Sequence, residues 1–488
     1  MTLRQKVSQG MLWEGGAMVA GRALSLVVTL LMARLLAPSS FGLVSIATLA
    51  INSLVFFQEL GFGAALIYRQ GDVTKASQTA HWTIVVSSLA LYAVAFAAAP
   101  LVAAFFRTPE VTSVLRVLAL TIVISSLSRV PFSLLYKEMD FRKKVLPEFL
   151  ASLGGNLVAL GLVVAGAGVW GLVWGQVADS VLRTGLVYLV HPWRPRLEFD
   201  RRLFRQLFGY GKHVTASQVL IFGITNIDDL FVGRMLGDTA LGHYGMAYRI
   251  SNLPATNITR LVSRVTFPAF SVLQSERERM RQIYFEVVRY VSLLAVPIAV
   301  ATVVFAHDFV YAVLNEQWAP AIVPMQWLAV YGLLRSVAAN MGNVFQAGGK
   351  PQWLSGIAAW RLATMAVLLY PAIRLGGVVG VCVLSAAVAL VDFFISGALS
   401  NRILEARMAA YGRLLAPLLL MAGLGGALGL GLTRGLMALG LWDVAALLAG
   451  GALMVAVYAG LLYWRDADLR RQVQRAVGYW RQRKPRTA

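Results

Sequence analysis

The chain has 488 residues, of which 58% are hydrophobic and only 14% are charged. A soluble protein of this length carries more charge and shorter apolar runs, so the composition excludes the soluble classes and indicates a membrane protein with many spans. The net charge of +21 would suggest a nucleic-acid partner in a soluble protein. Basic residues also collect on the cytoplasmic loops of membrane proteins, and we therefore expect no nucleic acid here.

Apolar stretches long enough to cross the ~30 Å hydrocarbon core of a bilayer recur along the whole chain. They predict an all-α polytopic membrane protein with about fourteen transmembrane helices. In chain order, the predicted helices cover residues 11–33, 41–65, 80–106, 113–135, 147–165, 169–190, 213–234, 241–270, 286–306, 320–346, 353–373, 377–399, 412–433 and 442–463.

The distribution of lysine and arginine predicts on which side of the membrane each loop lies. With the N-terminus in the cytoplasm, the inner segments hold 29 of the 44 basic residues and the outer loops hold five. Basic residues are enriched on the cytoplasmic side, so this alternation supports fourteen helices with both termini cytoplasmic. Thirteen helices would place the basic tail outside.

The loops limit the kind of chemistry that the chain could perform. Every predicted outer loop is short, so none could house an enzymatic domain. The inner loop His191–Lys212 alternates arginines with leucine and phenylalanine, which predicts a basic amphipathic helix on the inner membrane surface. The single cysteine, Cys382, excludes an intrachain disulfide. The sequence has no nucleotide-binding or metal-ligand motif, and we expect no cofactor and no metal site.

The chain also repeats itself at a nearly constant offset. At a shift of 200 residues, Asn52 meets Asn252, and the sequence Ala-Arg-Leu-Leu at 33–36 meets Gly-Arg-Met-Leu at 233–236. A parallel repeat of six-helix lobes with a site between them is a transporter pattern. The predicted parts are two pseudo-symmetric six-helix bundles over residues 1–205 and 206–403, an extra transmembrane helix pair over 404–463, and a basic cytoplasmic tail over 464–488.

The stretch Gly211–Leu273 is the most unusual, because it places several polar residues inside an apolar span. It predicts two spanning helices joined by a turn near residues 235–241. At ~100° per residue, Arg249, Asn252, Thr256 and Arg260 share one face of the second helix. An arginine at the bilayer centre costs at least ~2.5 kcal/mol, so this face must meet a partner or a water-filled cavity.

The first lobe carries a matching polar stripe. Arg22, Ser25 and Thr29 share a face of the first predicted helix, and Thr48, Asn52 and Glu59 lie within ~40° of one another in the second. If the lobes face each other, both stripes line one central cavity. A surplus of guanidinium groups suits an anion such as a diphosphate, which arginine binds in a fork. The substrate-binding residues that this predicts are Arg22, Asn52, Arg249, Asn252 and Arg260.

The charged residues within the spans allow a second interpretation, in which they are internal ion pairs that hold helices together. Asp228 and Asp229 are the candidate partners of the arginines in the following helix. The asparagines could equally serve as hydrogen-bonding contacts between helices rather than as ligands of sugar hydroxyls. For single residues such as Asp179 and Arg361, the ion-pair interpretation is favoured.

The chain resembles polysaccharide exporters of the Wzx type, in the multidrug/oligosaccharidyl-lipid/polysaccharide exporter superfamily, and is most similar to the colanic-acid-exporter branch. The resemblance covers about residues 1–400. It rests on Gly10-Met-Leu-Trp, on the segment from Leu31 to Gly42, on Gln58-Glu-Leu-Gly-Phe-Gly-Ala-Ala-Leu-Ile, on Pro195-Arg-Leu-Glu-Phe-Asp with Phe208-Gly-Tyr-Gly, and on Asn343-Val-Phe-Gln-Ala-Gly-Gly-Lys-Pro.

This resemblance implies a flippase of the bacterial cytoplasmic (inner) membrane. The implied substrate is an undecaprenyl-diphosphate-linked oligosaccharide for exopolysaccharide or lipopolysaccharide biosynthesis, moved by alternating access through a cationic cavity. A proton or sodium gradient could drive it, with Glu59, Asp228 and Asp229 as the ion-coupling candidates. The implied partners are membrane lipids and the polysaccharide polymerase and export machinery.

Two other functions compete with this one. An ion-coupled multidrug antiporter of the same superfamily would need an acidic surplus in its cavity, which the second lobe's arginines argue against. A membrane glycosyl polymerase or ligase would need an outer loop able to hold its acceptor and catalytic groups.

Overall fold

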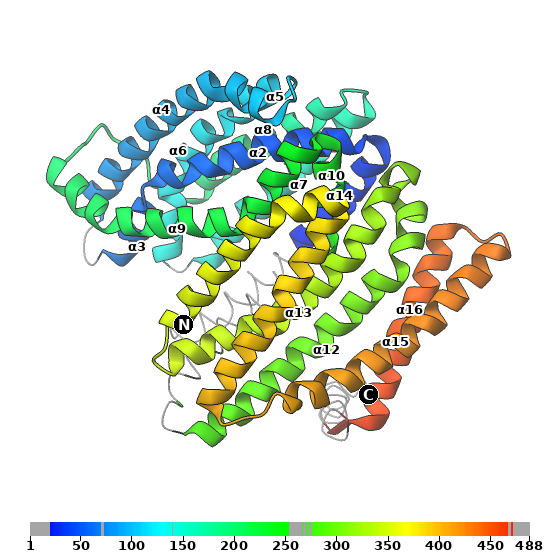
Figure 1. Cartoon of the computed structure of the whole chain (residues 1–488). Helices are drawn as coiled ribbons and strands as arrows, with labels where there is room; N and C mark the ends of the chain where they lie inside the picture. The colour runs from blue at the N-terminus through cyan, green and yellow to red at the C-terminus, as the bar shows by residue number, and fades with distance from the viewer. Residues whose placement is uncertain are drawn as a thin grey trace, which may run out of the picture. The chain divides into compact units, whose positions relative to one another are not determined.

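The computed structural model describes residues 20–466 except 70–72, 139, 253–265, 267–269, 271–272 and 274–275, and it also describes residues 470–471. Within these residues all regular secondary structure is helical (Figure 1). Nine of the helices described there are long and apolar enough to cross a membrane. The prediction of an all-α, multi-pass membrane protein is therefore confirmed.

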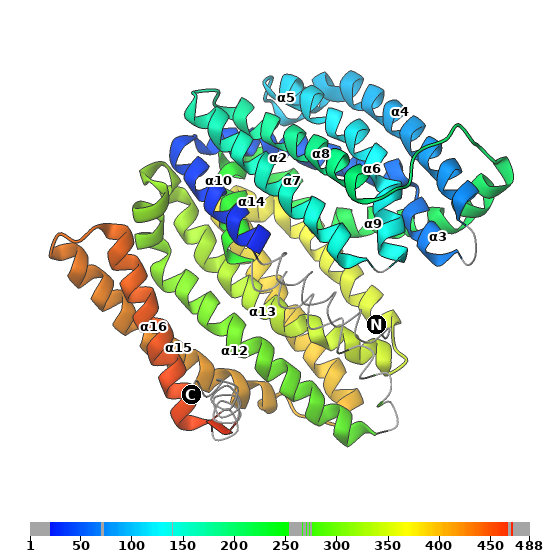
Figure 2. The ribbon, with the colours of Figure 1, turned by 180° about the vertical axis from the view of Figure 1, so that it is seen from behind.

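The chain forms two compact units, Met1–Gly245 and Met246–Ala488. In the first unit α7 and α8 lie side by side (Figure 2), and α6 packs against both α4 and α8. Residues 20–35 form a helix at the start of this unit. The next helices are α2 (Pro38–Glu59), α3 (Phe62–Tyr68), α4 (Thr74–Phe106), α5 (Val111–Leu118), α6 (Leu120–Lys137), α7 (Phe141–Val164), α8 (Val169–Val190), α9 (Arg201–Leu236) and α10 (Asp238–Ser251), whose last turn belongs to the second unit.

In the second unit α13 packs against both α12 and α14, and the paired helices α15 and α16 pack against α12 (Figure 1). Two short helices, η1 and η2, join α12 to α13. The elements are α12 (Arg277–Phe309), η1 (Val310–Leu314), η2 (Glu316–Ala321), α13 (Ile322–Ala347), α14 (Gln352–Leu404), α15 (Ala409–Ala438) and α16 (Asp443–Arg465).

The long helix α14 is two helices joined at a sharp bend. Gly377 there has φ 55° and ψ −136°, which no residue of a continuous helix adopts. Arg361 and Asp392 come within 3.8 Å of each other, although the ~1.5 Å rise per residue would hold them ~45 Å apart in a straight helix. The bend therefore folds α14 back on itself, and its halves correspond to the predicted helices at 353–373 and 377–399.

The predicted helix over residues 41–65 is broken near its end. Leu60 and Gly61 both adopt left-handed backbone conformations, with φ of 48° and 70°, and separate α2 from α3. A side chain at Gly61 would overlap the backbone of Gly211 in α9. A glycine is needed here both for the backbone conformation and for the close approach of α9.

The segment 191–212 differs in part from its prediction. Residues 191–200 form an extended strap over α4 rather than a helix, and only the part from Arg201 onward is helical. Side chains of α4 hold the strap through its backbone. Gln78 Nε2 donates to Arg194 O at 3.0 Å, Trp82 Nε1 donates to Arg196 O at 2.7 Å, and Gln78 Oε1 accepts from Arg196 N at 2.7 Å. These side chains of α4 bind backbone groups of the strap that would otherwise form the hydrogen bonds of a helix.

The helix that follows the strap is longer than predicted. The helix α9 runs without interruption over Arg201–Leu236, so the predicted surface helix and the predicted span at 213–234 are one element. Asp200 caps its N-terminus by accepting from the backbone N–H groups of Arg202 and Leu203. The predicted turn near 235–241 is present at Gly237, where φ is 88°.

Candidate functional site

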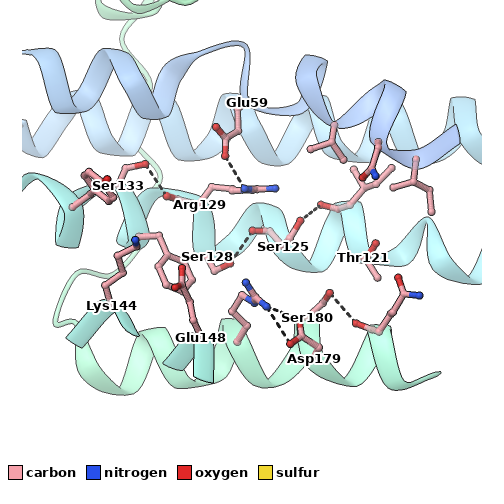
Figure 3. A pocket seen from close by; sticks show the side chains of 18 of the residues that line it. Glu59, Thr121, Ser125, Ser128, Arg129, Ser133, Lys144, Glu148, Asp179 and Ser180 are labelled. Carbon is pink, nitrogen blue, oxygen red and sulfur yellow. Dashed lines mark hydrogen bonds and ion pairs between the residues drawn. The ribbon is translucent and has the colours of Figure 1, made fainter. Parts of the chain in front are cut away.

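A polar cavity of about 480 Å³ lies among α2, α6, α7 and α8 of the first unit (Figure 3). Hydroxyl and amide side chains make up much of its wall, although the helices that supply them are otherwise apolar. These side chains are Thr48, Asn52, Thr121, Ser125, Ser128, Ser133, Gln176 and Ser180. A cavity of this kind inside membrane-spanning helices can hold water or a hydroxyl-rich ligand, since lipid cannot satisfy these groups.

An ion pair between two helices forms part of the cavity wall. Glu59, the last residue of α2, lies 3.0 Å from the guanidinium group of Arg129 in α6 (Figure 3). Both side chains are about one-third exposed, at 33% and 36%. Because α2 stops at Glu59, the carboxylate lies at the end of the helix beside α6. Its pairing matches the internal-ion-pair interpretation for this residue and also leaves it accessible from the cavity.

A second ion pair lies within α8 on the opposite wall. Arg183 donates to both carboxylate oxygens of Asp179, at 2.8 and 3.1 Å, one helical turn apart. Lys144 and Glu148 of α7 also line the cavity. The wall thus holds three acidic and three basic side chains, so its formal charges balance, and the cavity offers hydrogen-bonding groups of both kinds without favouring an ion of either sign.

Buried hydrogen bonds fix the helices around the cavity. Gln58, fully buried on α2, donates to Ile122 O at 2.8 Å and to Ser125 Oγ at 3.3 Å. Thr184 of α8 donates to Ile124 O at 3.1 Å. Both side chains bond to α6, so that α2 and α8 are held against the same helix, and this sets the spacing of the cavity walls.

The structure brings together some of the residues predicted from the sequence. Asn52 and Glu59 both line the cavity, together with Thr48, as their common helix face predicts. Arg22 lies in the helix over residues 20–35 and is not among the residues that line this cavity. On the same predicted stripe, Ser25 accepts a hydrogen bond from Asn156 of α7 at 2.9 Å, so this part of the stripe holds two helices together.

The remaining predicted residues lie elsewhere. Asp228 of α9 accepts a hydrogen bond from the buried Tyr244 of α10, and Asp229 is partly buried beside it. Arg249 is exposed in the last turn of α10, and Asn252 is buried directly after that helix. Arg260 lies outside the described residues. The assignment of these residues to substrate or ion stays a prediction.

The sequence analysis did not place Arg129, Asp179 and Arg183 at this cavity. Asp179 and Arg183 are four residues apart in one predicted span, and this spacing predicts an ion pair within the helix rather than a cavity wall. A signal for α6 was nevertheless present. Thr121, Ser125 and Ser128 recur at intervals of four and three residues, which places them on one helix face with Arg129 beside them. Such a stripe predicts a polar wall, although only the fold shows which helices share it.

Metal binding has no visible basis in the described part of the chain. There, no group of three histidine, cysteine, aspartate or glutamate side chains is placed to hold a metal ion. The chemistry that the cavity supports is hydrogen bonding and ion pairing with a polar ligand.

Membrane-spanning helices around a polar cavity are typical of membrane transport proteins. A family model described as "Polysaccharide biosynthesis protein" matches residues 31–323. This match covers more than half of the chain, and the protein therefore belongs to that family of polysaccharide biosynthesis proteins.

Curated relatives agree with this assignment. The chain is 26% identical over 378 residues to the teichuronic acid biosynthesis protein TuaB of Bacillus subtilis (strain 168), covering 75% of this chain and 77% of TuaB. It is 27% identical over 353 residues to the lipopolysaccharide biosynthesis protein WzxC of Escherichia coli (strain K12), covering 71% of each chain.

The fold is similar to that of the lipid II flippase MurJ in an inward closed conformation. The TM-score is 0.69 at 13% identity, over 93% of this chain and 99% of that chain. At this identity the likeness establishes the fold. Together, the family, the relatives and the fold identify a multi-pass inner-membrane protein of polysaccharide biosynthesis, whose relatives and structural neighbours are transporters and not enzymes. The resemblance to Wzx-type exporters is thereby confirmed, and it favours a transporter over a glycosyl polymerase or ligase.

Proposed function

We propose that this protein is a flippase that moves an undecaprenyl-diphosphate-linked oligosaccharide from the inner to the outer leaflet of the bacterial cytoplasmic membrane. The observation that carries the proposal is the polar cavity among α2, α6, α7 and α8. Its wall of hydroxyl and amide groups matches the hydrogen-bonding chemistry of a sugar, and its balanced charge suits a glycan better than a lone cation. Family membership supports the same substrate class.

In this proposal the cavity of the first unit receives part of the glycan. Asn52 offers both a donor and an acceptor, and the serines and threonines of α6 do the same. Arg22, Arg249 and Arg260, with Asn252, belong to the cationic path that the diphosphate follows during alternating access. Glu59, Asp228 and Asp229 are the candidates for coupling to a proton or sodium gradient.

The topology that accompanies this function has fourteen spans with both termini in the cytoplasm. The proposal also includes two repeats that meet near residue 205 and an extra pair of transmembrane helices over 404–463. The two compact units divide at residue 245 because α9 packs against α2, α3 and α4, and the first part of α10 lies against α2. An evolutionary repeat and a packing unit need not share one boundary.

Transport in proteoliposomes tests the proposal. A fluorescent undecaprenyl-diphosphate oligosaccharide is placed in one leaflet, and its movement is followed with and without proton or sodium gradients. We expect the wild type to translocate it, and Asn52→Ala with Ser125→Ala to slow translocation while the fold is retained. A wild type that leaves this lipid in place and exports an organic cation would instead establish the multidrug antiporter.

A further inference from the structure

A second group of polar side chains lies within the second unit, away from the cavity described above. It consists of Tyr331 and Arg335 on α13 and of Arg361, Asp392 and Ser396 on the two halves of α14, and we call it the arginine cluster. The fold of α14 at Gly377 is what brings Arg361 and Asp392 together. The sequence analysis treated Arg361 as one half of an ion pair, and it did not anticipate that Arg335 lies near the same carboxylate.

The cluster contains more positive than negative charge. Asp392 is 8% exposed, accepts a hydrogen bond from Ser396 Oγ at 2.8 Å and lies 3.8 Å from Arg361. Arg335 is within electrostatic range of both Arg361 and Asp392. Among the described residues, no carboxylate lies within ion-pair distance of Arg335. Two guanidinium groups therefore lie near a single carboxylate, and only that of Arg361 is within ion-pair distance of it.

Most hydrogen-bond donors of the two arginines are unused within the described chain. Arg335 donates from Nη1 to the phenol oxygen of Tyr331 at 3.1 Å, and its guanidinium carbon lies 5.6 Å from the centre of that ring. Arg361 is too far from Asp392 for a hydrogen bond and donates to no other described residue. Each guanidinium group has five N–H donors. Their side chains are partly accessible, so an incoming ligand with several oxygen atoms could accept from both.

The arrangement is rigid where it meets α10. Gly332 has no side chain and lies against the carbonyl oxygen of Ser251, and Ser251 Oγ donates to Met325 O at 2.8 Å. The last turn of α10 is thereby fixed on α13, and the ring of Tyr248 lies 6.3 Å from that of Tyr331. The two tyrosines form one side of the cluster. Their contacts hold the side chain of Arg335 in one position before any ligand binds.

We infer that the arginine cluster of the second unit is an anion-binding site that takes a diphosphate group through Arg335 and Arg361. A guanidinium group binds phosphate oxygens in a fork, and two such groups on neighbouring helices match the two phosphates of a diphosphate. A bound anion would supply the negative charge that the cluster lacks. This inference rests on the proposed function for the source of the diphosphate, since a lipid-linked oligosaccharide carries that group.

The chain contains a matched control for Arg335. Arg374 donates to the phenol oxygen of Tyr370 at 3.3 Å, and its guanidinium carbon lies 5.4 Å from that ring. The spacing of four residues is that of Arg335 and Tyr331 and the contacts are similar, but Arg374 is exposed and lies outside the arginine cluster. Loss of the arginine–tyrosine contact alone would affect both sites alike.

Binding of inorganic pyrophosphate to the purified full-length protein in detergent tests the inference. Calorimetry compares the wild type with Arg335→Gln, Arg335→Lys, Arg361→Gln and Arg374→Gln, and thermal unfolding without ligand reports whether each variant is folded. We expect at least a tenfold loss of affinity in both glutamine variants of the cluster, a smaller loss in Arg335→Lys, and wild-type affinity in Arg374→Gln. Unchanged binding in folded Arg335→Gln, or equal losses in Arg335→Gln and Arg374→Gln, would overturn the inference.

Competition distinguishes the sources of the phosphate groups. Undecaprenyl diphosphate should displace pyrophosphate, whereas orthophosphate and phosphatidylglycerol, with one phosphate each, should displace it at least tenfold less well. Equal competition by phosphatidylglycerol would show a general site for anionic lipids and would overturn the assignment to a diphosphate. Wild-type translocation in proteoliposomes is a separate readout. If the wild type transports the lipid, and Arg335→Gln transports the lipid and binds pyrophosphate as well as the wild type does, only the inference about the arginine cluster fails. If pyrophosphate binding depends on Arg335 but the wild type moves no lipid, only the proposed function fails.

Discussion

The ion pair between Glu59 and Arg129 is the contact whose removal tells most about the cavity of the first unit. We predict that Glu59→Gln and Arg129→Gln each destabilise the protein, and that the double variant is more stable than the sum of the single effects implies. The pair is short, at 3.0 Å, but each side chain is about one-third exposed to a cavity that can hold water. We therefore expect a coupling energy of about 1 kcal/mol, near the upper end for exposed pairs and below the ~3–5 kcal/mol lost when a fully buried pair is broken.

A double-mutant cycle measures this coupling. Unfolding of the four proteins is followed in mixed micelles as the fraction of denaturing detergent rises, and translocation is measured on the same preparations. The pair Asp179–Arg183, which joins two turns of one helix, serves as the comparison, and we expect a coupling of only ~0.3–0.5 kcal/mol there. Translocation measured without an ion gradient should recover in the Glu59→Gln/Arg129→Gln variant relative to either single variant, because the cavity regains its charge balance. Additive stabilities and a double variant that transports as poorly as the product of the single effects would refute this reasoning.

Three further predictions concern the fold. Gly61→Ala should destabilise the first unit by roughly 1–3 kcal/mol, because it puts a side chain on a left-handed residue that touches Gly211, whereas Gly356→Ala, on open helix surface, should be neutral or stabilising. Tyr411→Phe should cost about 1–3 kcal/mol by leaving the buried hydroxyl of Tyr284, 2.8 Å away, without its partner, and thermal unfolding measures it. The backbone N–H groups at the start of α9 lower the pKa of Asp200, so its capping contribution is complete above the unfolded-state pKa and is lost as the pH falls through the lower folded-state value. The protection factors for hydrogen exchange in the first turn of α9, which correct for the intrinsic exchange rate, should therefore fall in acid in the wild type, and should lose this pH dependence in Asp200→Asn.

Much of the helical framework could be predicted from hydropathy alone. The helices at 442–463 and 412–433, for example, coincide with α16 and α15, because each is an apolar run bounded by polar or charged residues. The breaks inside predicted helices could not be found in this way. Leu60 is an ordinary apolar residue with a left-handed backbone, and it is the close contact between Gly61 and Gly211 that requires the break.

The candidate site was predictable where one helix carries it. Thr48, Asn52 and Glu59 are on one helix, so periodicity alone placed them on a common wall. Arg129 and Asp179 come from helices that are distant from α2 in sequence, and nothing in the local pattern shows that they line the same cavity as Glu59. The arginine cluster is harder still, because its central contact depends on the fold of α14 at Gly377 and joins residues 361 and 392.

The strap over residues 191–200 is a suitable place to attach a fluorescent label to the active protein. Side chains of α4 hold the strap through hydrogen bonds to its main-chain amide and carbonyl groups. The strap side chains that point outward therefore contribute little to its attachment. Leu197 is 87% exposed and Phe199 is 60% exposed. A cysteine introduced at Leu197, with Cys382 buried and slow to react, would accept a fluorophore at a single position. The dye would lie between the sixth predicted span and α9. Its fluorescence in single molecules would report conformational changes at this junction during a transport cycle.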